Sequence, residues 1–178
     1  MNLYFAYGSN LHQIRLESRL GEADFLGKGK LHSSEIHFHK LGGDGSGKAT
    51  VQSSSDPQNV VWGAVYDLSK SQENLLDKYE SLGAGYHKTQ IEIEMKNGGK
   101  VPCFNYEGMR EYVDYTSLPF HWYKKLVVLG SLHLKFPDKY VEFLKSIQSE
   151  KDSNPKRVAT NQRLIKLMEE KNVDSHIK

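Results

Sequence analysis

The chain contains a single cysteine and no long apolar segment. Because Cys103 has no partner in the chain, it cannot form an internal disulfide, which is typical of proteins of the reducing cytoplasm. No apolar run reaches about 18 residues, so we expect no membrane-spanning helix and no membrane partner. The N-terminus begins with strand-like sequence rather than a basic segment before an apolar run. We therefore expect no signal peptide and a cytoplasmic location.

An excess of charge of one sign is also missing. The 24 lysines and arginines nearly balance the 22 acidic residues, and the net charge of +2 is too small to predict a nucleic-acid partner. The chain has 178 residues, of which 38% are hydrophobic, and shows no internal repeat. This is enough for one domain with a core. We expect a single domain over residues 1–178, in which 137–178 form a C-terminal helical extension.

Strand-like segments are frequent in the first 106 residues. They are rich in β-branched and aromatic residues or alternate between apolar and polar residues. The sequence KNGGK at 96–100 is typical of a hairpin turn, and DPQN at 56–59 of another turn. The segments are 2–7, 23–31, 34–41, 59–68, 87–96 and 100–106.

Capping residues predict two helices in the same part of the chain. The first covers about 10–20, with Asn10 as its N-cap, a glutamine three positions later, and Gly21 at its end. The second covers about 70–81 and begins after Ser69, which also has a glutamine three positions later. Many strands in series with few helices favour an α+β fold with a mixed or antiparallel sheet that curls on itself.

The C-terminal part is predicted to be helical. A helix over about 138–149, after Pro137, carries one apolar face formed by Tyr140, Val141, Leu144 and Ile147. A more polar helix is expected over about 157–171, and we expect the tail at 169–178 to fray. Residues 107–137 give no readable pattern.

Two stretches resemble ligand-binding motifs, but we expect neither of them to bind a ligand. Residues 42–49 nearly match a phosphate-binding loop, but Ala49 replaces the hydroxyl residue that would hold magnesium, and strand-like sequence follows where a helix is needed. We expect a glycine-rich hairpin loop and no nucleotide cofactor. His37 and His39 alternate along a strand, yet no third ligand lies at a suitable spacing, so we expect no metal.

Glu80 is the most informative acidic residue. On a wheel of the helix at 70–81, one side carries Leu75, Leu76, Tyr79 and Leu82. Glu73 and Asp77 lie on the opposite side, and Glu80 lies at the border, in the last turn. The negative end of the helix dipole and partial burial would both raise the pKa of Glu80 toward the range useful for acid–base catalysis. The alternative is a solvated helix-end carboxylate, with Gly83 and Gly85 as a cap and a turn.

The stretch YFAYGSN at Tyr4–Asn10 predicts a second site. A strand ends there and a helix begins with only a Gly-Ser pair between them. Gly8 permits a close approach of the backbone. The N–H groups of Gly8, Ser9 and Asn10 lie at a helix start, where they have no intrahelical partner, and could bind an anion.

Five segments together resemble the gamma-glutamylcyclotransferase family. They follow one another in the family's order across about residues 2–145. They are YFAYGSNL (4–11), VWGAVYDL (61–68), LDKYE (76–80), CFNY (103–106) and YKKLVVLGS (123–131).

This resemblance implies a small β-barrel surrounded by helices, often as a homodimer. It also implies cleavage of a small-molecule γ-glutamyl amide to 5-oxoproline and a free amine, with no cofactor and no metal. Glu80 would be the catalytic acid and base. Substrate would be bound by Tyr4, Phe5, Ala6, Tyr7, Gly8, Ser9, Asn10, Tyr86, Tyr106 and Tyr123.

Two departures from the family affect the mouth of the pocket. The family commonly has glycine after the glutamate, where this chain has Ser81, and the stretch from Glu80 to Tyr86 is shorter than usual. Several alternatives stay open. They are γ-glutamyl-amines, γ-glutamyl-ε-lysine, a γ-glutamyl-tagged metabolite or glutathione as substrate, or a non-catalytic protein that binds a γ-glutamyl ligand.

Overall fold

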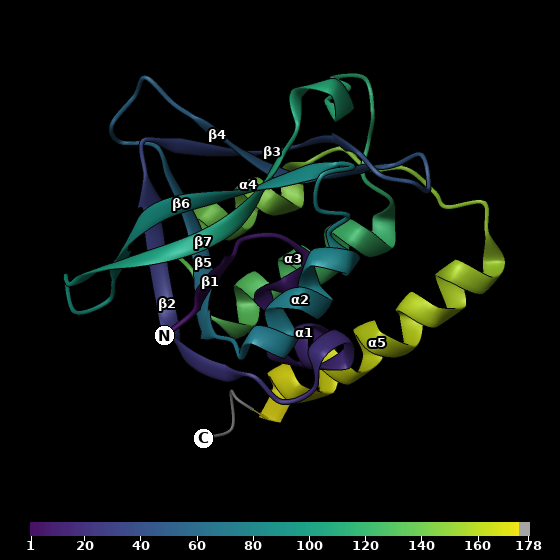
Figure 1. Cartoon of the computed structure of the whole chain (residues 1–178). Coiled ribbons are helices and arrows are strands. Elements are labelled where there is room, and N and C mark those ends of the chain that lie inside the picture. Colours follow the sequence, from purple (N-terminus) through teal and green to yellow (C-terminus); the bar gives the residue numbers. More distant parts are fainter. Residues whose placement is uncertain (175–178) are drawn as a thin grey trace.

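Five strands of the computed structural model, which describes residues 1–174, close into a barrel (Figure 1). Neighbouring strands are antiparallel except at the closure, where Tyr4 of β1 pairs in parallel with Phe104 of β7. The order round the barrel is β1 (Leu3–Ala6), β5 (Val60–Asp67), β2 (Asp24–His32), β6 (Tyr86–Met95) and β7 (Lys100–Gly108). All five strands match predicted segments to within two residues at each end, because their alternation matches the two faces of a sheet.

A separate hairpin, β3 (Ser34–Leu41) and β4 (Gly47–Ser53), lies beside the barrel. Its loop is the glycine-rich stretch, closed by a hydrogen bond from Gly42 N to Ser46 O at 2.8 Å. The predicted hairpin loop is therefore confirmed. On the barrel side, Gly108 N donates to Thr50 Oγ1 at 2.9 Å.

The corner after β1 differs from its prediction. A 3-10 turn, η1 (Ser9–Leu11), precedes α1 (Gln13–Leu20). The N-cap is His12, whose Nδ1 accepts from Ile14 N at 3.2 Å, so the prediction of Asn10 as the cap is wrong. Because the helix begins later than predicted, the Asn10 side chain is available for other partners. Gly21 ends α1 as predicted, with φ of 75° and its N–H on Glu17 O.

Helix α2 (Lys70–Tyr79) starts with the predicted capping box of Ser69 and Gln72. The predicted apolar face is wrong, however. Of its members Leu76 is fully buried, whereas Leu75, Tyr79 and Leu82 are exposed. Glu73, predicted to face solvent, is buried. It accepts hydrogen bonds from Lys88 on β6 and from Lys70. These lysines make a charged inward face stable, which a wheel of one helix cannot predict.

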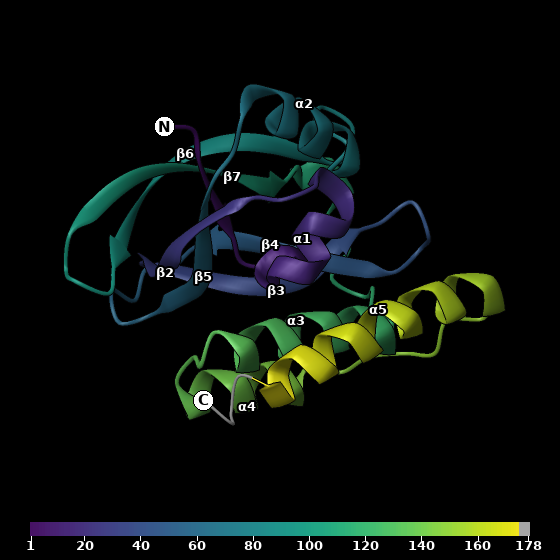
Figure 2. The same cartoon turned by 90° about the horizontal axis from the view of Figure 1, so that it is seen from below.

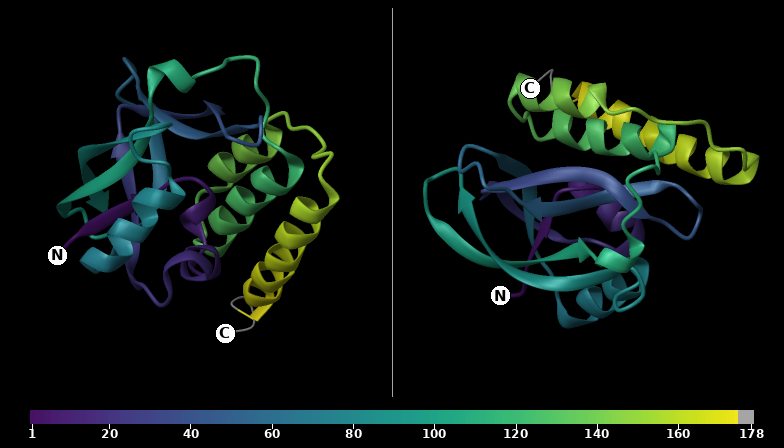
Figure 3. Two further views of the ribbon diagram at one scale, coloured as in Figure 1. Left: turned by 45° about the vertical axis from the view of Figure 1, so that its right-hand side comes forward. Right: turned by 90° about the horizontal axis from the view of Figure 1, so that it is seen from above.

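Helix α3 (His121–His133) lies in the stretch that gave no sequence pattern, which also holds the 3-10 turn η2 (Arg110–Tyr112). With α4 (Asp138–Ser146) and α5 (Pro155–Asp174), it forms a helical layer on one side of the barrel, while α2 covers the other side (Figures 2 and 3). Val141 and Leu144 of α4 are buried as predicted. No helix within residues 1–174 is long and apolar enough to cross a membrane.

Helix α5 is longer than predicted. Its last turns do not fray, and the rest of the predicted tail, 175–178, lies outside the described residues. Asn172 explains the extra length, because its side chain is buried and contacts three partners within residues 1–174. Its Nδ2 donates to Leu129 O at 3.1 Å, and its Oδ1 contacts His12 Nε2 at 3.2 Å and His133 Nδ1 at 2.8 Å.

The buried His12 predicts a pH-dependent stability. Burial, and after it the neighbouring His133, lowers the pKa of His12 from 6.5 to about 4. The unfolded state therefore binds more protons between these values, and stability is lost as the pH falls from 6.5 to 4, by roughly 3 kcal/mol. Urea unfolding across this range measures the loss. His12→Asn keeps a capping side chain without a titrating group, so its dependence should be flatter by that amount. Equal slopes would contradict the prediction.

Candidate active site

A small cavity joins the corner after β1 to the end of α2. It measures about 30 Å³, room for a water molecule or two. We call it the inner pocket. It is lined by Tyr4, Tyr7, Gly8, Ser9, Asn10, Ala49, Glu80, Tyr86, Tyr106 and Tyr123. The structure thus brings together nine of the eleven residues predicted for the site, from β1, η1, α2, β6, β7 and α3.

Phe5 and Ala6 are the two predicted site residues that do not line the inner pocket. Both are fully buried in the core of the barrel. Consecutive strand residues point to opposite faces, so the Phe5 side chain leaves the face used by Tyr4. Ala6 is paired with Ala64 of β5. Neither residue lines the inner pocket, and their role as substrate contacts stays a prediction.

Glu80 is the C-cap residue of α2, and its Oε1 is held by two donors. Asn10 Nδ2 and Arg19 Nη1 each donate to it at 3.0 Å. Arg19 is not among the residues predicted for the site. Its positive charge offsets the negative charge of Glu80, which the C-terminal end of a helix disfavours. Within the described residues, Oε2 makes no hydrogen bond, so this oxygen is the one available to a substrate.

Asn10 links the corner to Glu80. Its Nδ2 also contacts the Tyr4 hydroxyl at 3.1 Å, and its Oδ1 accepts from Arg19 Nη1 at 3.0 Å. The Arg19 guanidinium in turn lies over the ring of Tyr79, 5.1 Å from its centroid. The carboxylate is therefore oriented by a network rather than by the helix alone.

The pocket tyrosines differ in the hydrogen bonds that their hydroxyl groups make. Tyr7 donates to Tyr106 O, Tyr86 to Ala49 O, and Tyr106 to Asp77. Because their hydroxyl protons are already donated to the protein, these three tyrosines line the pocket without offering a free hydrogen-bond donor. Tyr123 Oη accepts from Ala49 N at 3.1 Å. Burial raises the pKa of all of these tyrosines, which keeps them neutral.

The corner presents backbone donors to the inner pocket. The N–H groups of Gly8, Ser9 and Asn10 make no hydrogen bond to any acceptor within residues 1–174. A side chain at Gly8 would be crowded, because a Cβ there would lie 3.0 Å from Ala49 Cβ and 3.4 Å from Tyr123 Oη. The residues that carry the predicted unpaired N–H groups therefore line the same pocket as Glu80.

A larger cavity of about 150 Å³ adjoins the inner pocket and shares Ser9, Glu80, Tyr86 and Tyr123 with it. We call it the outer pocket. It adds four basic residues that the sequence analysis missed, Arg15, Arg19, Lys40 and Lys48. The two arginines stand four positions apart on one helix just after the corner, a signal that could have found them. The two lysines come from the β3–β4 hairpin and carried no such signal.

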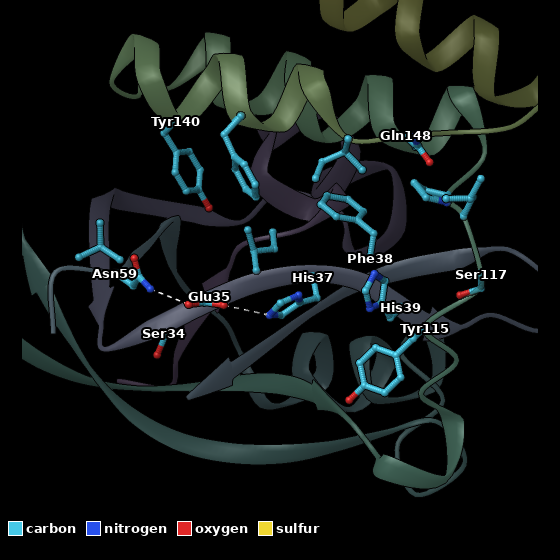
Figure 4. A pocket seen from close by; sticks show the side chains of 16 residues that line it. Ser34, Glu35, His37, Phe38, His39, Asn59, Tyr115, Ser117, Tyr140 and Gln148 are labelled. Atoms are coloured by element: carbon cyan, nitrogen blue, oxygen red, sulfur yellow. Dashed lines mark hydrogen bonds and ion pairs between the residues drawn. The ribbon is translucent and has the colours of Figure 1, made fainter. Parts of the chain in front are cut away.

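A cavity larger than either pocket lies elsewhere, between β3 and α4, and measures about 610 Å³. Figure 4 shows Tyr140 of α4 on one side and His37, His39 and Tyr115 on the other. The histidine rings are 5.6 Å apart, and Glu35 pairs with His37 at 3.4 Å (Figure 4). No metal-binding group of three acidic, histidine or cysteine side chains occurs within residues 1–174. Neither lysine nor arginine lines this cavity, so it lacks cations for an amino-acid carboxylate.

Comparison with known proteins identifies the family. The model of the AIG2-like family matches residues 60–144. Human gamma-glutamylcyclotransferase is 33% identical over 152 residues, which cover 82% of this chain and 78% of that protein. The chain belongs to the gamma-glutamylcyclotransferase family. The bovine gamma-glutamylcyclotransferase is 32% identical over 153 residues, with the same two shares.

A solved structure of a gamma-glutamyl cyclotransferase has the same fold. It is 28% identical, superposes with a TM-score of 0.78, and the match covers 93% of this chain and 98% of that one. The α+β fold with its closed barrel is thus the cyclotransferase fold that the resemblance implied.

The backbone after Glu80 has a conformation that favours the glycine expected there from the family resemblance. Ser81 has φ of 51°, in the left-handed region that favours glycine. We predict that Ser81→Gly raises the free energy of unfolding by about 0.5 to 1 kcal/mol, because it removes this strain. Denaturant unfolding measures the change. Ser71→Gly, within α2, should act in the opposite direction, and a destabilised Ser81→Gly would refute the argument.

Proposed function

We propose that this protein is a gamma-glutamylcyclotransferase that converts γ-glutamyl amides to 5-oxoproline and a free amine. The observation that carries the proposal is the hydrogen bond between Asn10 of the corner and Glu80, at 3.0 Å. It places the one carboxylate of the inner pocket against its cluster of backbone donors. The names of its relatives support the same activity.

The reaction is an intramolecular displacement. The α-amine of the substrate attacks its own γ-carbonyl, a C–N bond forms to close a five-membered ring, and the original amide C–N bond breaks. Only the free amine is a nucleophile, so a base must first take a proton from the α-ammonium group. We assign this step to Glu80 Oε2, which has no hydrogen bond within the described residues.

The same proton completes the reaction. The leaving nitrogen would depart as an amide anion unless it is protonated, and the protonated Glu80 can donate to it. One carboxylate between the two nitrogens therefore acts first as base and then as acid. An ammonium group becomes the N–H of a lactam, so the α-nitrogen loses two protons in all. One proton passes through Glu80 to the leaving nitrogen, and the second is also taken up by the departing amine, which is released as an ammonium ion. The reaction therefore needs no external oxidant, reductant or cofactor.

The corner supplies the electrostatic part of catalysis. The N–H groups of Gly8, Ser9 and Asn10 would bind the α-carboxylate of the substrate or the oxyanion that develops on the γ-carbonyl. The walls formed by Tyr7, Tyr86 and other aromatic residues would hold the glutamyl chain in the folded geometry that cyclisation needs.

Release of 5-oxoproline tests the proposal. Purified protein incubated with γ-glutamyl-alanine should form 5-oxoproline and alanine in equal amounts, also in the presence of a metal chelator. Chromatography of both products gives the measurement. Thermal stabilisation by the dipeptide without any product would instead favour the non-catalytic binding protein.

The preferred substrate and assembly are separate proposals. A panel with a γ-glutamyl-amine, γ-glutamyl-ε-lysine and glutathione would rank the substrates that share this chemistry. We also propose a homodimer, as the family resemblance implies, and a cytoplasmic location. Light scattering after size-exclusion chromatography tests the first, and cell fractionation tests the second.

A further inference from the structure

The outer pocket carries more positive charge than its own acidic groups neutralise. Two of its four cations have carboxylate partners, Arg19 on Glu80 at 3.0 Å and Lys48 on Asp44 at 2.8 Å. The other two, Arg15 and Lys40, form no ion pair with any residue from 1 to 174. Two cations without carboxylates on one cavity indicate that an anionic ligand completes the site.

Lys40 is held in place although its charge is unpaired. The residue is only 6% exposed, which is unusual for a lysine without a carboxylate. Its stem passes Gly108, where a Cβ would lie 2.9 Å from Cγ, and its Nζ lies beside Gly85, where a Cβ would lie 2.6 Å away. The ammonium group sits over the Tyr86 ring, 4.5 Å from its centroid. Gly85, Gly108 and the Tyr86 ring therefore hold the ammonium group of Lys40 beside Tyr86, a residue that lines both pockets.

Arg15 approaches the same cavity from α1. Its Nε is buried and has no hydrogen-bond acceptor within the described part of the chain. The charged and titratable groups that act on it most are Arg19, Tyr123, Glu80 and Tyr79, and Arg19 is already paired with Glu80. A buried guanidinium nitrogen without an acceptor is unfavourable, and a ligand carboxylate would relieve it.

The γ-glutamyl half of the substrate already has its partners in the proposed reaction. Its α-carboxylate or oxyanion binds at the corner, and its α-ammonium faces Glu80. Arg15 and Lys40 therefore face the part that leaves. An ordinary amino acid as leaving group brings one carboxylate, which pairs with one of these cations. An acidic amino acid brings a second carboxylate for the other.

We propose that Arg15 and Lys40 form an anion subsite for the leaving amine, and that the enzyme prefers γ-glutamyl conjugates of acidic amino acids. This inference rests on the proposed cyclotransferase activity and names its substrate class. The bonds that form and break are unchanged, since the subsite only binds the group that departs. Substrates whose leaving amine has no anionic group should be the poorest.

The test compares two dipeptides of nearly equal size, γ-glutamyl-glutamate and γ-glutamyl-glutamine. They differ in one charge on the leaving residue. We expect kcat/KM for the glutamate conjugate to be larger by about tenfold or more, because a hydrogen bond to a charged group contributes more than one to a neutral group. A ratio near one in the wild-type protein overturns the subsite without any variant.

Lys40→Met then tests whether Lys40 causes the preference for the glutamate conjugate. It should reduce the ratio by about tenfold, through a higher KM for the glutamate conjugate and an unchanged kcat. Equal losses on both dipeptides would overturn the assignment. Lys30→Met is the matched control, because Lys30 pairs with Glu94 on the barrel surface outside both pockets and should leave both values unchanged. Arg15→Met, checked by circular dichroism, should lower kcat/KM for both dipeptides by a similar factor, because Arg15 then pairs with the carboxylate that both leaving residues share. If neither dipeptide yields 5-oxoproline, the proposed activity itself fails.

Discussion

Glu80→Gln should lower the rate of 5-oxoproline formation by about 10³- to 10⁴-fold, which for most assays is a complete loss. General acid–base groups contribute about 10²- to 10⁴-fold, and here one residue serves both proton transfers. Glutamine keeps the acceptor for Asn10 and Arg19 but cannot take the proton of an ammonium group. Steady-state rates on γ-glutamyl-alanine measure the loss.

Two further variants make this prediction specific. Glu80→Asp keeps the charge but withdraws it by one methylene, so an intermediate loss of about 10²-fold is expected from misplacement alone. Glu94→Gln removes a carboxylate that pairs with Lys30 on the barrel surface, and its activity should equal that of the wild type. Near-normal turnover by a folded Glu80→Gln protein would show that another group moves the proton.

Gly8→Ala should be the second most damaging change, with a loss of about 10²-fold or more in kcat/KM. The added methyl group would lie 3.0 Å from Ala49 Cβ and 3.4 Å from Tyr123 Oη, in a cavity of only about 30 Å³. It would displace the backbone donors of the corner from the position that an anion needs. Removal of a single such donor has effects of about 10²- to 10³-fold in other enzymes.

A matched glycine separates this effect from a general loss of stability. Gly99→Ala lies in the β6–β7 turn, and its added Cβ would meet only the Asn97 side chain. It should leave kcat/KM unchanged. Thermal unfolding should show a modest loss for Gly8→Ala, so that the purified variant is folded at assay temperature. Wild-type kcat/KM in Gly8→Ala would mean that the corner does not bind the reacting groups.

The corner after β1 shows how much of the site the local sequence pattern can predict. The abrupt end of the strand and the unpaired N–H groups of Gly8 and Ser9 follow from residues that are neighbours in sequence, and both are found in the structure. Asn10 lines the inner pocket, but its side chain does not have the predicted role. Its position suggested a helix cap, whereas His12 takes that role and the Asn10 side chain reaches Glu80, 70 residues away.

Helix α2 shows where local pattern fails. A wheel assumes that apolar residues face inward, and this placed Glu73 in solvent. Lys88, on β6, pairs with Glu73 and Asp77 beneath the helix, and it makes a polar inward face favourable. Such a pairing depends on which strand lies below the helix. Helix α3 was missed for a related reason, since it is buried on several sides and lacks an amphipathic pattern.

The sequence by itself determined the strands of the barrel, the last residue of α1, the start of α2, the corner and the carboxylate, because turns, caps and strand alternation depend on residues close together in the chain. Tertiary structure alone decided that Arg19 holds Glu80, that Ala49 closes the inner pocket, and that Lys40 and Arg15 are left without carboxylates. These contacts join segments tens of residues apart. Their formation depends on how the hairpin, the helices and the barrel pack, and no local rule encodes that arrangement.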